Sequence, residues 1–279
     1  MAENSGIAWT TNTFNSHIGC TKVSPGCDHC YAEAYDARFG GSHWGPGAPR
    51  RRTSAANWAK PRKWNREAEK TRVRPWVFCA SLADVFDKEA PLGVRGDLWQ
   101  LIHECKNLNW QLVTKRIGNA DKMLPANFGR DFPHVGIISS VVTQAECDRD
   151  LPKLLDAKER HGIAWVGLSI EPQLERVIPQ SDGIDWVITG GESDQGGHLG
   201  REYRADWARD LIAWGRRRGV AIFVKQMGSH WARENFSSRD TAADPLGWPA
   251  DIRVRQMPFG VPTTFEARDA ACAKWEAGE

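Results

Sequence analysis

The chain has no apolar run that approaches the roughly 18 residues of a membrane span. Its first ten residues, MAENSGIAWT, lack the basic and then apolar layout of a signal peptide, so we expect a cytoplasmic protein. It also lacks internal repeats and a strong charge imbalance: 37 basic and 35 acidic residues leave a net charge of +2, which gives no support to nucleic-acid binding over the whole surface. With 279 residues, 41% of them hydrophobic, the chain is long enough for one large α/β barrel or two small domains.

The seven cysteines are an odd number in a chain too long to need disulfide staples. Three of them, Cys20, Cys27 and Cys30, lie within eleven residues, and clustered thiols in a reducing compartment are more often metal ligands. The other four are scattered among apolar neighbours, where we expect small core residues without chemistry: Cys79, Cys105, Cys147 and Cys272.

From residue 76 onward, short apolar runs alternate with amphipathic stretches, which is the pattern of a parallel sheet with connecting helices. The expected strands are 7–10, 76–80, 110–114, 135–139, 164–168, 186–189 and 221–225. The expected helices begin at about residue 31 and cover 91–106, 117–124, 144–160 and 204–218, the last stopped by Gly219. Seven β-units predict a parallel (β/α) barrel, partial or complete; a doubly wound open sheet is the competing architecture.

Two segments depart from this alternation. Residues 40–74 are rich in Gly, Pro, Arg and Trp, and we expect a flap or excursion over the barrel mouth. Its cations and aromatics interleave from Arg50 to Trp64, a mixture that can grip phosphates and stack on bases, although a solvated loop is the alternative. After Gly228 the sequence has few patterns typical of a helix or a strand until 265–276, where we expect a short helical tail.

The expected organisation is a barrel over residues 1–228 and a C-terminal extension, 229–279, packed on it. The barrel carries the cysteine loop, 17–31, and the basic, Trp-rich insertion, 40–74.

The three clustered thiols belong to the segment CTKVSPGCDHCY, in which Cys27 and Cys30 lie where a helix is expected to begin. A structural zinc site needs four ligands, whereas an iron–sulfur cluster with three cysteines leaves one iron open for S-adenosylmethionine. An electron passed from the cluster to S-adenosylmethionine would then break its carbon–sulfur bond and yield a deoxyadenosyl radical. Zinc is the alternative, because His17 or His29 would complete a set of three cysteines and one histidine. A redox pair of Cys27 and Cys30 would leave Cys20 without a role.

The segments WTTNTFN, from Trp9, and GCTKVSPGCDHCYA, from Gly19, resemble a family of phage and prophage proteins with a three-cysteine motif, regarded as radical S-adenosylmethionine-like. Further matching segments are CASLADVF from Cys79, LVTKR from Leu112, LSIEP from Leu168, WVITGGES from Trp186 and FVKQ from Phe223. The resemblance implies a cluster-bearing barrel of the TIM-like type and, for a phage-encoded protein, the host cytoplasm. It implies no substrate. The cysteine spacing is six residues and then two, as in this family, whereas radical enzymes usually have three and then two.

Polar residues at the carboxyl ends of the strands are the candidate ligand contacts, because chemistry in a parallel barrel collects there. The candidate contacts for S-adenosylmethionine are Ser81, Asp84, Ser139, Gly190, Gly191 and Glu192. The two glycines would let backbone amides approach a ligand, and the carboxylate can receive an ammonium. In radical enzymes a similar Gly-Gly-Glu segment follows the second strand, whereas here it follows the sixth. We expect Glu171 and Lys225 nearer the substrate, as a proton donor or an anion clamp.

The sequence thus predicts a radical enzyme with a 4Fe-4S cluster and S-adenosylmethionine, supplied by a reducing electron donor and modifying or isomerising a nucleotide or DNA base. One alternative is a zinc-stabilised nucleic-acid-binding or interaction module without turnover. Another is a radical enzyme that acts on a small metabolite or peptide. The sequence does not indicate an oligomeric state.

Overall fold

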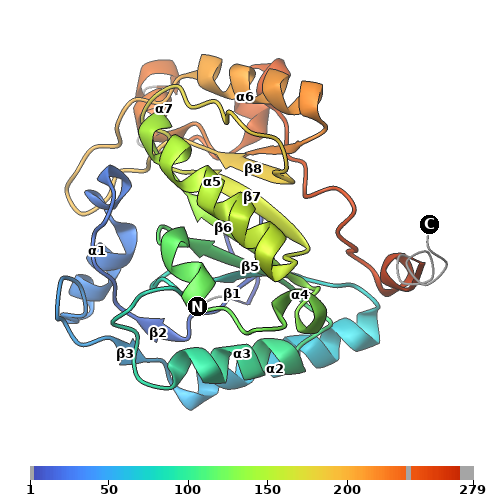
Figure 1. Cartoon of the computed structure of the whole chain (residues 1–279). Coiled ribbons are helices and arrows are strands. Elements are labelled where there is room, and N and C mark those ends of the chain that lie inside the picture. Colours follow the sequence, from blue (N-terminus) through green and yellow to red (C-terminus); the bar gives the residue numbers. More distant parts are fainter. Residues whose placement is uncertain (1–2, 237–239, 271–279) are drawn as a thin grey trace.

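A computed structural model describes residues 3–236 and 240–270. Seven parallel strands form one curled sheet in the order β1-β4-β5-β6-β7-β8-β9 (Figure 1). Their bounds are β1 (Asn12–Thr13), β4 (Trp76–Cys79), β5 (Asn109–Thr114), β6 (Val135–Ser140), β7 (Trp165–Ile170), β8 (Trp186–Thr189) and β9 (Ala221–Val224). The strands follow one another in chain order without the reversal that defines a doubly wound sheet, and β1 and β9 are the two edges. The fold is therefore a partial parallel barrel, as predicted.

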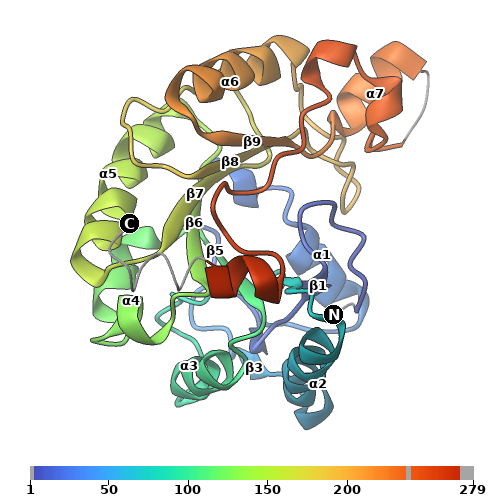
Figure 2. The same cartoon turned by 90° about the vertical axis from the view of Figure 1, so that its right-hand side faces the viewer.

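Helices cover the outer face of this half-barrel (Figure 2). They are α2 (Ala55–Thr71), α3 (Val94–Glu104), α4 (Phe128–Asp131), α5 (Gln144–His161) and α6 (Ala205–Arg218), while α1 (Tyr31–Arg38) and α7 (Gly228–Phe236) lie toward its open side. Short 3-10 turns cover Pro25–Cys27, Ile117–Lys122, Pro245–Gly247 and Ala250–Ile252. A second, two-stranded antiparallel sheet pairs β2 (His17–Ile18) with β3 (Arg51–Arg52).

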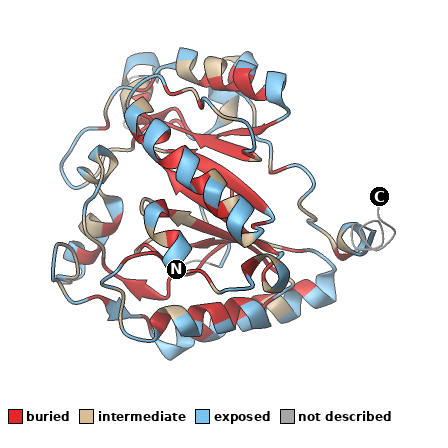
Figure 3. Cartoon of the chain, viewed as in Figure 1, coloured by how far each residue is buried: buried red, intermediate tan, exposed pale blue. Residues whose placement is uncertain are grey.

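The core has two main parts, because strands of the half-barrel are buried on both faces (Figure 3). One part lies between the sheet and its helices. The other is an aromatic cluster that includes Trp9, Trp76, Trp165 and Trp186. Gly136 makes room for it, since a Cβ there would lie 2.0 Å from the Trp165 ring. A small third cluster joins Ile18, Ala32 and Leu82.

The C-terminal segment runs from one edge of the half-barrel toward the other. Gln256 donates its backbone N–H to Ile222 of β9, and Arg74, just before β4, donates its N–H to Thr263. Asn109, at the start of β5, donates its side-chain amide to the Pro262 carbonyl. The segment therefore passes the amino-terminal ends of the strands and leaves their carboxyl ends open.

Most expected elements match the structure to within a few residues, and Gly219 ends α6 in the left-handed region at φ 68°. The first strand is displaced, from the expected 7–10 to β1, because residues 7–10 form a turn instead. The expected helix at 117–124 is a 3-10 turn.

The expectation of an irregular flap at 40–74 is wrong. Most of its second half is α2, which Ser54 caps by accepting the N–H of Asn57. Trp58 and Trp64 are buried in the core beneath this helix. The sequence of this segment shows no clear helical pattern, because the apolar face of the helix is made of tryptophans set among many cations.

Two further expectations concern the end of the chain. The stretch after Gly228 has more regular structure than expected, since it begins with α7. The tail helix expected at 265–276 is helical over 265–270, and its remainder lies outside the described residues. None of the helices described is both long and apolar enough to cross a bilayer.

Candidate active site

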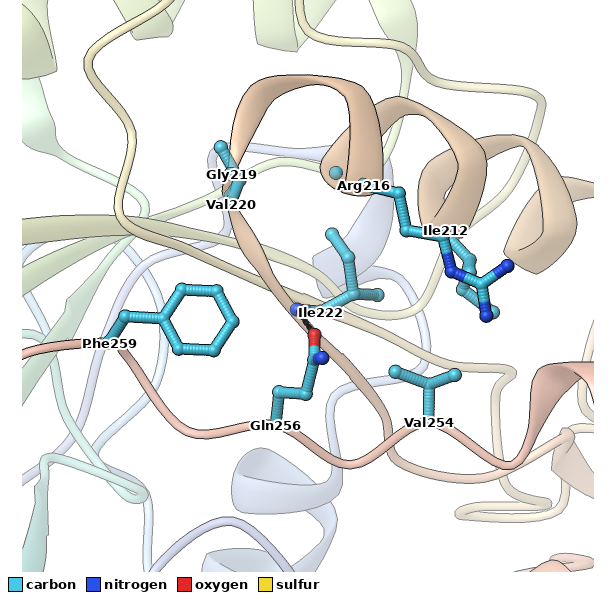
Figure 4. Close-up of a pocket in the computed structure, with 9 residues that line it drawn as sticks. Ile212, Arg216, Gly219, Val220, Ile222, Val254, Gln256 and Phe259 are labelled. Carbon is cyan, nitrogen blue, oxygen red and sulfur yellow. Dashed lines mark hydrogen bonds between the residues drawn. The ribbon is translucent and has the colours of Figure 1, made fainter.

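A cavity of about 470 Å³ lies at the carboxyl ends of the strands. Its walls come from the cysteine loop and from the loops that follow β4, β5, β7, β8 and β9. A smaller cavity of about 210 Å³ lies between α6, β9 and the segment that pairs with β9, and no cysteine lines it (Figure 4). The larger cavity is therefore the candidate site.

The cysteine loop is held by backbone contacts at its start. Gly19 donates its N–H to the Leu82 carbonyl at 3.0 Å, next to the end of β4. Its φ is +118°, and a Cβ there would lie 2.5 Å from the carbonyl oxygen of His43, so glycine is required. Ser24 then caps the 3-10 turn by accepting the N–H of Gly26, and Cys30 is the N-cap residue of α1.

Cys20 lies against a buried arginine. Arg116, just after β5, places Nη1 3.1 Å from Cys20 Sγ and 3.3 Å from Asp84 Oδ2, and its Nη2 donates to the Thr21 carbonyl at 2.6 Å. Its side chain is 10% exposed. The guanidinium therefore joins the cysteine loop to the loop after β4.

Burial sets the protonation of two of the thiols. It raises the pKa of Cys20 to about 11, against the opposing charge and hydrogen bond of Arg116. Burial also raises the pKa of Cys30, against the backbone N–H groups at the start of α1. Both thiols hold their protons at neutral pH in the metal-free protein, so metal binding must release protons.

Three cysteine thiols at one cavity are the donor set that an iron–sulfur cluster with one open iron would need. Cys20, Cys27 and Cys30 line the same cavity, yet in the described part of the chain no three His, Cys, Asp or Glu side chains converge closely enough to hold one ion. Three cysteines of a four-iron cluster each bind a different iron, so their sulfurs must stand apart.

The two histidines of the zinc alternative have other partners. His17 is buried in β2, outside the cavity lining, with Nδ1 3.0 Å from Ser16 Oγ. His29 lines the cavity, but its Nδ1 lies 3.1 Å from Glu192 Oε2.

Of the candidate contacts that follow β4, Ser81 and Asp84 both line the cavity. Ser81 accepts from Asn15 Nδ2 at 2.9 Å, and its carbonyl accepts from the Tyr31 hydroxyl at 2.6 Å. Asp84 is buried and engaged by Thr114 Oγ1 at 2.7 Å and by the backbone N–H of Lys115 at 2.9 Å. Arg116 donates to it as well, so both oxygens of the Asp84 carboxylate already accept hydrogen bonds from protein groups.

The Gly-Gly-Glu segment after β8 is tightly packed. A Cβ on Gly191 would lie 2.2 Å from the Met227 carbonyl oxygen, so this glycine is needed for the approach of two protein loops. Glu192 accepts from Arg201 Nη2 at 2.6 Å and from His29. Burial raises its pKa, but the bonds and charge of Arg201 outweigh burial and leave the pKa below its usual value. Gly191 and Glu192 line the cavity, whereas Gly190 does not.

Ser139 is fully buried and does not line the cavity; its neighbour Ser140 does. Ser140 accepts a hydrogen bond from Lys115 Nζ. Adjacent residues of a strand point to opposite faces, so only one of these two serines can face the cavity. A position at the end of a strand does not show which of the two it is.

Glu171 and Lys225 meet in the cavity wall. Lys225 Nζ lies 3.0 Å from Glu171 Oε1, and the side chains are 28% and 12% exposed. They follow β9 and β7, on either side of β8. The pair places a carboxyl group and an amino group beside the cavity.

Sequence reasoning missed Arg201, which contacts both Glu192 and the Pro25 carbonyl of the cysteine loop. It lies in a stretch without periodicity, far along the chain from that loop, so no local signal identifies it. Ten of the thirteen tryptophans in the described part of the chain are buried, which removes most of them as base-stacking groups. Arg50 is also buried, bound to Asp87 at 3.0 Å, and does not grip a phosphate.

Comparison with solved structures supports the fold. A single-residue mutant of spore photoproduct lyase matches with a TM-score of 0.52 and 13% identity, over 80% of this chain and 79% of that chain. Spore photoproduct lyase complexed with dinucleoside spore photoproduct matches with a TM-score of 0.45 and 14% identity, over 78% and 76%. A double mutant with bound AdoMet and dinucleoside spore photoproduct gives 0.42 and 11%, over 84% and 63%.

The likeness to the first of these structures confirms the expected half-barrel fold. None of the curated proteins compared with the sequence matches it. A family model described as "Protein of unknown function (DUF5131)" matches residues 4–258; that description names neither phage nor the cysteine motif. Since the match covers nearly the whole chain, the chain belongs to the family of proteins of unknown function DUF5131.

Proposed function

We infer that this chain is a radical S-adenosylmethionine enzyme. The observation that carries the inference is that Cys20, Cys27 and Cys30 line one cavity at the carboxyl ends of a parallel half-barrel. The fold likeness to a radical S-adenosylmethionine enzyme supports it. When bound, a 4Fe-4S cluster with one open iron and S-adenosylmethionine would supply a 5′-deoxyadenosyl radical able to abstract a hydrogen.

The chain's own residues would orient S-adenosylmethionine from two sides of the cavity. Ser81 and Asp84 place oxygens near the cysteine loop, and Gly191 and Glu192 lie opposite. The N–H of Gly191 already donates to the Gln226 carbonyl, so S-adenosylmethionine would meet the carboxylates of Asp84 and Glu192, each of which would share an oxygen that now accepts from an arginine. The proposed set of contacts also includes Ser139 and Gly190, which lie behind the lining and would act by supporting it.

Glu171 and Lys225 are proposed to serve the substrate. The ammonium can bind an anionic or carbonyl oxygen, and the carboxyl group can give or take a proton at its Oε1. Because the two groups pair with each other, a substrate that binds one of them must loosen its contact with the other.

The proposed substrate is a nucleotide or a DNA base, in keeping with a phage DNA modification. Its support is the shared fold of spore photoproduct lyase, which acts on a DNA lesion. The expected support from the Arg50–Trp64 stretch is reduced, since Arg50, Trp58 and Trp64 are buried. Its remaining cations are exposed or half-buried: Arg51, Arg52, Lys60, Arg62 and Lys63. A reducing electron donor is required by the chemistry.

The test is anaerobic reconstitution with iron and sulfide, reduction in the presence of S-adenosylmethionine, and chromatography for 5′-deoxyadenosine. We expect deoxyadenosine from the wild type and none from Cys27→Ala. Tightly bound zinc without deoxyadenosine would instead support a binding module without turnover.

Substrate class is tested separately, by adding duplex DNA, free nucleosides or small peptides to the reconstituted protein. Stimulated turnover with DNA, and DNA affinity that falls steeply with rising salt, are the expected results. Turnover with nucleosides or peptides but not with DNA would overturn the DNA substrate.

A further inference from the structure

We propose that Arg116 is a positioning residue that holds Cys20 in place for the cluster and raises the cluster's reduction potential. The proposal rests on the function proposed above. It starts from the contact between Arg116 Nη1 and Cys20 Sγ at 3.1 Å. This contact joins residues 96 positions apart in the chain.

Cys20 depends on a long-range partner because it has no helix end of its own. Cys30 is the N-cap residue of α1, so backbone N–H groups can favour a negative sulfur there. Cys20 lies instead in an extended stretch that forms an isolated bridge to Trp44, and a six-residue gap separates it from Cys27. The guanidinium of Arg116 supplies the positive charge that this position lacks.

The guanidinium is held on three sides. Its Nη2 donates to the Thr21 carbonyl at 2.6 Å, and its Nη1 also reaches Asp84 Oδ2 at 3.3 Å. Asp84 is itself anchored by Thr114 Oγ1 at 2.7 Å and by the N–H of Phe86 at 2.9 Å. Asp84 therefore fixes Arg116, and Arg116 fixes Cys20.

A buried donor at a ligand sulfur affects the redox equilibrium of a cluster. Reduction adds a negative charge that is partly carried by the thiolate sulfurs, so a cation hydrogen-bonded to one of them stabilises the reduced form. Arg116 is 10% exposed, which limits the screening of its charge by water. Its removal should make the midpoint potential more negative.

The chain offers a matched control one residue away. Lys115 lines the same cavity and carries the same charge, but its Nζ donates to Ser140 instead of a cysteine. Arg116→Gln and Lys115→Gln thus remove one positive charge each from one site. Only Arg116→Gln also removes a hydrogen bond to sulfur.

The experiment reconstitutes wild type, Arg116→Gln and Lys115→Gln without air, measures iron and sulfide per chain, and titrates the cluster potential by electron paramagnetic resonance. We expect full clusters in all three, with a more negative potential in Arg116→Gln and a clearly smaller shift in Lys115→Gln.

Suppose that every variant holds a cluster, and that the midpoint potentials of Arg116→Gln and Lys115→Gln shift equally or not at all. This result would overturn the inference about Arg116 and leave the proposed function standing. If Arg116→Gln cannot retain iron, Arg116→Lys is titrated in its place; it keeps the charge but loses the fixed contacts of the guanidinium, so a potential more negative than that of the wild type is expected, whereas a wild-type potential counts against the proposal. A wild type that takes up no iron would overturn the proposed function and this inference together.

Discussion

His29 Nδ1 lies 3.1 Å from Glu192 Oε2, a contact between residues 163 positions apart. It joins the cysteine loop to the Gly-Gly-Glu segment after β8. That segment follows the sixth expected strand, yet the curl of the half-barrel brings it to the rim of the cavity that the cysteines line. A late position in the chain is therefore compatible with a place beside the cysteine loop.

The three clustered cysteines should be separable from the buried ones by iron content. Cys27→Ala should lose its iron, because each thiol of a three-cysteine cluster holds a different iron atom. Cys147→Ala, in the core face of α5, should retain full iron and lose only about 1 kcal/mol of stability. Equal iron contents in the two variants would contradict a cluster at this loop.

The ion pair of Glu171 and Lys225 should matter for turnover. Glu171→Gln and Lys225→Ala should each lower the rate of substrate conversion by about 100-fold or more, the usual effect of removing a positioned acid or base. Iron content and cluster spectra should stay as in the wild type. Glu69→Gln, an exposed change on α2, is the control, and rates near normal in the two site variants would remove the assigned role.

Gly136→Ala should destabilise the fold. A Cβ there would meet ring atoms of Trp165 at 2.0 to 2.3 Å, and we expect a loss of about 1–3 kcal/mol in the free energy of unfolding by urea. Gly96→Ala in α3, with open space around it, should gain about 0.5–1 kcal/mol. A Gly136→Ala protein as stable as the wild type would mean that the aromatic cluster can shift.

Burial lowers the pKa of His134 to about 4, from an ordinary 6.5, while its Nε2 donates to the Ile102 carbonyl at 3.0 Å. Below pH 6.5 the unfolded chain binds a proton at His134, whereas the folded chain does not until the pH approaches 4. The contribution of neutral His134 to the free energy of unfolding is therefore complete above pH 6.5 and is lost as the pH falls toward 4. At pH 5 the loss is about 2 kcal/mol. The fall in unfolding free energy from pH 7.5 to 5 should be smaller by this amount in His134→Gln; an identical fall in both proteins would contradict it.

Local patterns account for much of what could be foreseen. The six strands after residue 76 were recognisable because each is a short apolar run bounded by turn residues, and α6 because Gly219 marks its end. Helix α2 was not recognisable, because its buried face is built from Trp58 and Trp64 among charged neighbours, a composition equally suited to an exposed binding segment. Only packing distinguishes the two.

The sequence by itself determined the three-cysteine loop and the parallel half-barrel, since thiol spacing and the alternation of strands and helices are properties of neighbouring residues. The tertiary structure alone decided which strand-end groups face the cavity: Ser140 and not Ser139, and Arg116 on the sulfur of Cys20. It also placed Arg201 on Glu192. Such pairings join distant parts of the chain through the curl of the sheet, and no local pattern encodes that curvature.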